Sequence, residues 1–91
     1  MFKIHIKEIY PDGQSVAILA DGSLDHETIP ILLEVCKRHW EVERKVELHL
    51  EGLIRLSREG MDFLQEIQNK VTLVNPPNFI KLTRQEPAEF D

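Results

Sequence analysis

The segment that decides the fold is Ser15-Val16-Ala17-Ile18-Leu19-Ala20, which runs directly into Asp21-Gly22-Ser23-Leu24-Asp25. The first part is apolar at almost every position, and a short apolar run bounded by turn signals is typical of a strand in the middle of a sheet. The second part is rich in residues that favour turns, so we expect the strand to break there. The chain therefore contains a central strand with a loop behind it.

A second strand precedes the central one. Phe2, Ile4 and Ile6 alternate with polar residues, which is the period of a strand with one solvated face. Pro11-Asp12-Gly13 is a turn signal, because proline presets φ and glycine tolerates the exit conformation. The two strands and their turn predict a β-hairpin.

An amphipathic helix follows the break. Asp25 or Thr28 is a suitable N-cap, and Pro30 fits the first turn of a helix capped by Thr28. The residues that recur at helical spacing form one apolar stripe: Ile29, Leu32, Leu33, Cys36 and Trp40. Its place on this stripe indicates that Cys36 is a buried, inert thiol. The charged run 41–45 behind the helix predicts a solvated turn.

The second half of the chain repeats the strand–helix alternation. Residues 46–51 alternate strictly and predict a strand with one solvated face. Ser57 is a good N-cap for a short helix whose apolar side is Met61, Phe63, Leu64 and Ile67, and Asn69 is a suitable left-handed terminator. Residues 71–74 predict another strand, and Phe79, Ile80 and Leu82 a last short element.

The order β-β-α-β-α-β predicts the fold class. We expect a single α/β domain over residues 1–84, followed by a polar tail over 85–91. The mixed four-stranded sheet would consist of an N-terminal β-hairpin and then β-α-β-α-β, with right-handed crossovers and both helices on one face. The alternation in the first and third strands favours an open second face.

Composition limits the function. A net charge of −5 argues against a nucleic-acid surface, because phosphate contacts need lysine and arginine. No apolar run is long enough to span a bilayer, and the first residues lack a signal peptide's apolar region. A single cysteine fits a reducing compartment, so we expect a cytoplasmic protein.

No enzyme signature is present. The glycines form no phosphate-binding loop, and Ser, His and Asp show no nucleophile-elbow spacing. His5, His26, His39 and His49 lack a ligand spacing, although His5 and His49 are expected on one open strand face. We therefore expect no catalytic residue, no metal and no cofactor.

In this order of elements the chain resembles STAS domains, the sulfate-transporter and anti-sigma-factor-antagonist modules. The resemblance rests on the hairpin, on Gly22-Ser23-Leu24-Asp25, which is similar to that family's Gly-x-Leu-Asp corner, and on residues 71–75, which are similar to its last strand and following Asn. It extends from Phe2 to about Leu82 and implies one module of that family's size.

The resemblance also implies a regulatory site at the start of the second helix. The family pattern Asp-Ser-Ser-Gly aligns with Ser57-Arg58-Glu59-Gly60, so only the glycine is kept. Arg58 stands where the family has its phosphorylated serine, and arginine cannot accept a phosphate. We expect Ser57 to be a structural cap rather than a phosphoacceptor, which leaves the domain without the usual switch.

What remains is a role in binding. The resemblance implies docking on a protein partner, either an anti-sigma-factor-like ATPase or a transporter component. The docking residues would be Ser57, Arg58, Glu59, Gly60, Met61 and Phe63, with Asp21, Ser23 and Asp25 nearby. The alternative is a structural subunit of a membrane transport complex or a homodimer that associates through the open face, expected to carry Lys3, His5, Glu47 and His49.

Overall fold

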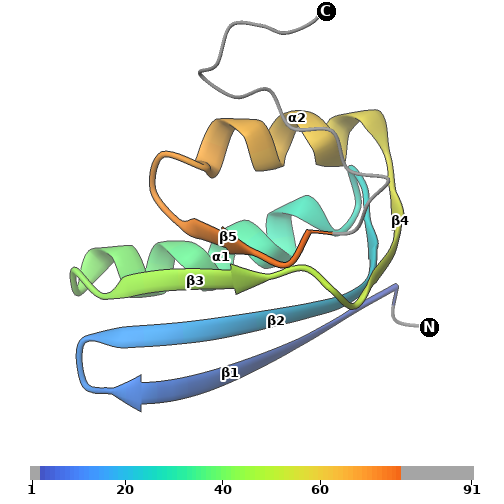
Figure 1. The fold of residues 1–91 in the computed structure, drawn as a ribbon. Helices are drawn as coiled ribbons and strands as arrows, with labels where there is room; N and C mark the ends of the chain where they lie inside the picture. Colours follow the sequence, from blue (N-terminus) through green and yellow to red (C-terminus); the bar gives the residue numbers. More distant parts are fainter. Residues whose placement is uncertain (1–2, 77–91) are drawn as a thin grey trace, which may run out of the picture.

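The computed structural model describes residues 3–76, which form an α/β domain with one mixed sheet (Figure 1). The elements are β1 (Ile4–Asp12), β2 (Ser15–Leu24), α1 (Ile29–Glu41), β3 (Lys45–His49), β4 (Leu53–Leu56), α2 (Arg58–Ile67) and β5 (Thr72–Val74). β1 is antiparallel to β2, and every other strand pairing is parallel. The predicted class is confirmed. The last element at Phe79, Ile80 and Leu82, the boundary at residue 84 and the tail lie outside the described residues.

Within residues 3–76 the sheet has five strands, where the sequence predicted four. The additional strand is β4, which was not expected from Leu53-Ile54-Arg55-Leu56 because this segment is short. β3 pairs with the first half of β2, and β4 pairs with its end, so the two strands follow the same edge of β2 with residues 50–52 between them. Across its width the sheet runs β1-β2-β3-β5, which is why the strand pattern indicated four positions.

The break predicted after Ala20 is wrong, because β2 continues to Leu24. Gly22 has a φ of 109°, and the β2–β4 register shifts between Gly22 and Ser23. A glycine inside a strand often marks such a bulge, since it adopts a conformation that other residues resist. The amide of Gly22 donates to the carbonyl of Gly52 at 3.0 Å. The residues that resemble a turn therefore bend a strand without ending it.

Two other local predictions need correction. β1 extends through Pro11 to Asp12, and proline is tolerated there because β1 is an edge strand with a register shift between Ile9 and Asp12. α2 ends with Gln68 as its C-cap. Asn69 is not left-handed: within residues 3–76 the non-glycine residues with positive φ are Glu43 and Asn75.

α1 begins where the sequence predicted, with Thr28 at the N-cap position and Pro30 in the first turn. The Thr28 side chain, however, does not cap the helix. Its hydroxyl donates to the carbonyl of Ser23 and accepts from the amide of Asp25, both at 2.9 Å. Thr28 thus fixes the loop between β2 and α1. No helix within residues 3–76 has the length and apolar character needed to cross a membrane.

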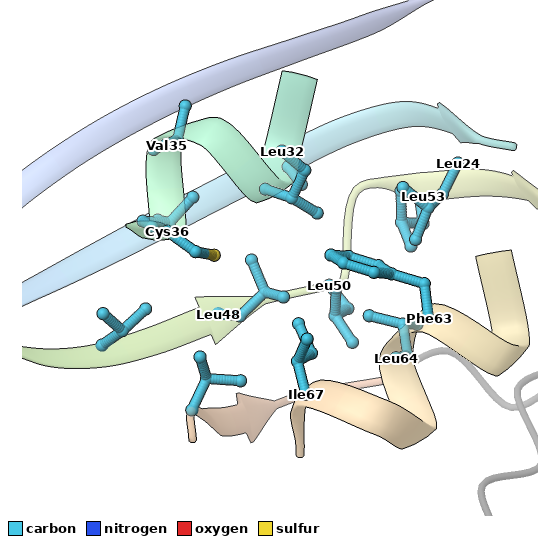
Figure 2. Packing of buried hydrophobic residues seen from close by; sticks show 14 of the residues in the cluster. Leu24, Leu32, Val35, Cys36, Leu48, Leu50, Leu53, Phe63, Leu64 and Ile67 are labelled. Atoms are coloured by element: carbon cyan, nitrogen blue, oxygen red, sulfur yellow. The ribbon is translucent and has the colours of Figure 1, made fainter. Parts of the chain in front are cut away.

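Both helices pack on one face of the sheet, as predicted (Figure 1). One cluster of buried apolar side chains joins the helices to β2, β3 and β4, and Figure 2 shows ten of them labelled: Leu24, Leu32, Val35, Cys36, Leu48, Leu50, Leu53, Phe63, Leu64 and Ile67. Each fully buried aliphatic or aromatic side chain contributes about 1.5–3 kcal/mol. Trp40 and Leu33 are half-buried at the margin of this core.

The other face of the sheet carries the alternate residues of the strands. His5 lies opposite Asp21, and His49 lies opposite Leu19, so the two histidines share this face as expected. Lys3 was expected on the same face, but its amine instead reaches the loop behind β2, where it contacts Asp25. We call the surface around His5, Leu19 and His49 the open face.

Replacement of Gly22 tests the bulge. A Cβ at this position would overlap the carbonyl oxygen of Lys3, and φ is left-handed, so we expect Gly22→Ala to lower the free energy of unfolding by about 1–3 kcal/mol. Gly13→Ala is the matched control, because a Cβ there meets nothing within 4 Å. Urea unfolding followed by circular dichroism measures both. Equal midpoints for the two variants would contradict this account of the bulge.

Candidate partner-docking site

The start of α2 is held by main-chain and side-chain hydrogen bonds. Ser57 is extended, with φ −82° and ψ 172°, and its Oγ accepts from the amide of Gly60 at 3.0 Å. The amide of Ser57 in turn donates to the carbonyl of Leu24 at the end of β2, also at 3.0 Å. Ser57 is therefore the predicted N-cap, and it joins the helix to the strand beside it.

Gly60 allows this approach. It is buried, and a Cβ built on it would lie 2.5 Å from the carbonyl oxygen of Leu24 and 2.9 Å from Cδ1 of Leu56. Any side chain would push the first turn of α2 away from the end of β2. Glycine inside a helix normally costs about 1 kcal/mol of stability relative to alanine. It is favoured at position 60 because the Leu24 carbonyl leaves no room for a Cβ.

The loop after β2 lies next to the helix start, because Leu24 pairs with Leu56 at the carboxyl ends of two parallel strands. Asp25 organises this loop. Its Oδ1 accepts from the amide of Glu27 at 2.9 Å and from that of Thr28 at 3.2 Å, while Oδ2 lies 2.6 Å from Nζ of Lys3. The Lys3 amine, followed by the two amides, lowers the pKa of Asp25 below its ordinary value. Hydrogen bonds to Asp25 and Glu27 raise the pKa of Lys3.

The structure brings together only part of the predicted docking set. Arg58 and Glu59 are exposed on the first turn of α2, and Met61 is half-buried beside them. Ser23 and Asp25 lie nearby, as expected, although Asp25 is already occupied by Lys3.

Three predicted members do not present side chains at this surface. Phe63 is 7 % exposed and packs into the core among Leu50, Leu53 and Leu64 (Figure 2), because it lies on the sheet-facing side of the helix. Gly60 is buried under the end of β2. Asp21 precedes the bulge and lies opposite His5 on the open face, away from α2. The surface that we call the α2-start surface therefore consists of Ser57, Arg58, Glu59 and Met61.

A second polar cluster, which the sequence reasoning missed, lies at the other end of the sheet. The hydroxyl of Tyr10 donates to Glu8 Oε1 at 2.8 Å, which lowers the pKa of Glu8 and raises that of Tyr10. The His39 ring is buried against Tyr10, with 5.8 Å between ring centroids. The signal in the sequence was weak: Glu8 and Tyr10 share a strand face, and His39 lies in the last turn of α1.

The charged run forms an exposed turn at Val42 and Glu43, as predicted, but Arg44 is partly buried and belongs to this cluster. Its Nη1 donates to Nδ1 of His39 at 3.1 Å, and its guanidinium lies 5.4 Å from the centre of the Tyr10 ring. Arginine can only donate, so Nδ1 of His39 accepts and the ring proton lies on Nε2. Nε2 is buried, 3.6 Å from Glu8 Oε2, and has no hydrogen-bond partner within residues 3–76.

Chemistry-bearing residues elsewhere do not converge. Within the described part of the chain, no group of three or more His, Cys, Asp or Glu side chains has the geometry of a metal site. His49 lies 3.4 Å from Glu47 at the surface. Cys36 is fully buried in the core, and burial raises the pKa of its thiol to about 11. At neutral pH this thiol is protonated and shielded from reagents.

Comparison with known proteins adds no assignment. No protein-family model matches the sequence, and no curated protein sequence matches it. The function is therefore inferred from the residues and their arrangement.

The contact between Gly60 and β2 predicts an unusual helix mutant. Gly60→Ala should lower the free energy of unfolding by about 1–3 kcal/mol, although alanine is the better helix former, because the Cβ would meet the Leu24 carbonyl. Glu66→Ala on the exposed side of the same helix serves as control and should change it by less than about 0.5 kcal/mol. Guanidinium unfolding measures both variants, and a stabilised Gly60→Ala protein would refute the close contact.

The Lys3–Asp25 ion pair predicts how stability depends on pH. Because the pKa of Asp25 is lower in the folded than in the unfolded chain, its contribution is complete at neutral pH. It shrinks as the pH falls below the ordinary value of 3.8 and is lost below the folded value. Asp25→Asn retains an oxygen for the two amides but removes the charge, so we expect a lower melting temperature at pH 7 and a vanishing difference from wild type at strongly acidic pH.

Lys3→Met is the matched control for this pH dependence. It should also lower the melting temperature at pH 7, partly because Lys3 contacts Glu27 at 2.9 Å as well, and the double variant should lose less than the sum of the two single variants. Fully additive effects would show that Asp25 acts through the loop amides and not through Lys3.

Proposed function

We propose that this chain is a non-enzymatic, STAS-like protein-interaction domain that resembles an anti-sigma-factor antagonist and docks on its partner through the α2-start surface. One observation carries the proposal: Arg58 and Glu59 are exposed on a helix start whose main chain is fixed by the Ser57 cap and by the seat of Gly60. Because the main chain that carries these side chains is already fixed, less conformational entropy is lost when a partner binds.

The arrangement of elements supports the family resemblance. The hairpin, two parallel crossovers, helices on one face and a loop beside the second helix start agree with the layout that the resemblance implies. In that layout Arg58 takes the position of the phosphorylated serine, and the Ser57 hydroxyl accepts a hydrogen bond from the helix. We therefore propose a docking surface without the phosphorylation switch, available to the partner at all times.

The charge pattern of the α2-start surface supports a protein partner. Arg58 and Glu59 have opposite charges, and the chain as a whole carries −5, so a protein surface with both signs of charge fits better than a nucleic acid. We propose an anti-sigma-factor-like ATPase as the partner class, with a transporter component as the other. The buried single cysteine supports placing the domain in the cytoplasm.

A second candidate is a structural role, as a subunit of a membrane transport complex or as a homodimer. The open face favours it, because no helix within residues 3–76 covers this face and Ile9, which lies opposite Ala17 on it, is 46 % exposed. The two candidates differ in solution mass. A dimer whose mass does not depend on concentration supports assembly, and a monomer supports docking on a different protein.

Quantitative affinity purification from the native source tests the docking surface. Wild type, Arg58→Glu and Glu66→Arg serve as baits, the last being an exposed charge reversal on the same helix. We expect Arg58→Glu to lower the recovered amount of a specific partner by about five- to thirtyfold, because reversing a contacting charge costs of order 1–2 kcal/mol. Glu66→Arg should retain it.

The identity of the protein recovered separates the hypotheses. An ATPase of the anti-sigma type supports transcriptional regulation, and a transport ATPase supports assembly. The proposed docking without a switch is wrong if Arg58→Glu retains every partner. It is also wrong if phosphate is found on Ser57 after incubation with an anti-sigma-factor kinase and ATP.

A further inference from the structure

The outer edge of β1 offers main-chain groups for pairing. β1 is the first strand of the sheet order, so within residues 3–76 it is paired on one side, with β2 (Figure 1). The amide of Ser23 donates to the carbonyl of Lys3 at 2.7 Å, which places Lys3, and by alternation His5 and Lys7, in the positions that bond to β2. The amides and carbonyls of Ile4 and Ile6 therefore point outward, where no strand of residues 3–76 pairs with them.

An apolar groove borders this edge on the helix-covered side. Its lining consists of Ile4, His5 and Ile6 from β1 and Ile31 from α1. The Ile31 side chain is half-exposed although its neighbour Leu32 is fully buried. An added strand would place every second side chain into this groove, because side chains alternate between the faces of a strand.

The opposite side of the same edge carries His5 and Lys7. Both are exposed on the open face, and neither has an ion-pair partner within residues 3–76. Asp21 lies opposite His5 on β2, whereas Lys7 lies opposite Leu19, so no charged residue of β2 faces Lys7 directly. The remaining side chains of an added strand would lie beside these two residues, where a carboxylate is favoured and an amine is not.

A second copy of the chain fits this edge poorly. In antiparallel self-pairing that keeps Ile6 on the groove side, three registers are possible. If Ile6 lies opposite Ile4 of the other copy, Lys7 lies opposite Lys3. If Ile6 lies opposite Ile6 or Glu8, Lys7 lies opposite His5 or Lys7, respectively. Each of these registers places Lys7 against a basic residue, and a lysine on an edge strand is a common obstacle to self-association.

We propose that the outer edge of β1 binds, by strand addition, an extended segment of another protein in which apolar and acidic residues alternate. The apolar side chains enter the groove between Ile6 and Ile31, and the acidic ones lie beside His5 and Lys7. The outward main-chain groups of Ile4 and Ile6 supply the hydrogen bonds. This surface is separate from the α2-start surface and does not depend on the function proposed for it.

Blocked, fluorescein-labelled peptides test the proposal on the full chain by fluorescence anisotropy. The acidic probe is Thr-Val-Glu-Val-Glu-Val-Thr, and the matched basic probe replaces both glutamates with lysine. We expect the acidic peptide to bind at least about tenfold more tightly, and Lys7→Glu to reverse this preference. Ile31→Glu should weaken the acidic peptide by about the same factor, whereas Lys37→Glu, a charge reversal on the exposed side of α1, should not.

Amide hydrogen exchange supplies the main-chain readout. The acidic peptide should slow exchange at Ile4 and Ile6, and a peptide with proline in place of the central valine should not, because it loses a donor. Three results would overturn the proposal: equal binding of the two peptides, binding without protection of these amides, or protection in the peptide-free protein that rises with its concentration, which would make the edge a self-interface.

Discussion

β2 is hydrogen-bonded along both of its sides, and it positions the strands and helix starts that contact it. β1 pairs with one side, and β3 and then β4 pair with the other. A strand paired on both sides and covered by helices must be apolar on its inner face, and Val16, Ile18 and Leu24 are fully buried. The end of β2 also sets the positions of two helix starts, since the Leu24 carbonyl accepts from Ser57 and the Ser23 carbonyl from Thr28.

The parts of the fold with strong periodicity could be predicted from the sequence. The stripe that includes Leu32 and Cys36 predicted α1, and Ser57 predicted the start of α2. The predictions that failed concern segments whose residues suit two local structures equally well. Asp-Gly-Ser at positions 21–23 is as suitable for a bulge as for a turn, and the register with β4 that decides between them is a contact between distant parts of the chain.

The candidate site was predictable in place but not in composition. Parallel strands end at the same edge of a sheet, so the loop after β2 and the start of α2 had to be neighbours. The apolar side of the second helix was predicted to include Phe63, but the resemblance implied docking through the start of that helix, and Phe63 was therefore counted at the surface. In the structure that apolar side packs against the sheet. Arg44 was taken for a solvated residue because Tyr10, whose ring its guanidinium contacts, lies on the distant strand β1, although the Arg44 amide already donates to the nearby His39 carbonyl at 3.0 Å.

The match between Gly60 and the STAS pattern has a structural explanation. It is the residue at which this chain matches the Asp-Ser-Ser-Gly pattern of STAS domains, and the Leu24 carbonyl beneath it leaves no room for a side chain. A glycine that packing requires is expected at this position whether or not its neighbours receive a phosphate. The match therefore follows from a helix start that rests on the end of a strand, and any domain of this architecture would favour a glycine there.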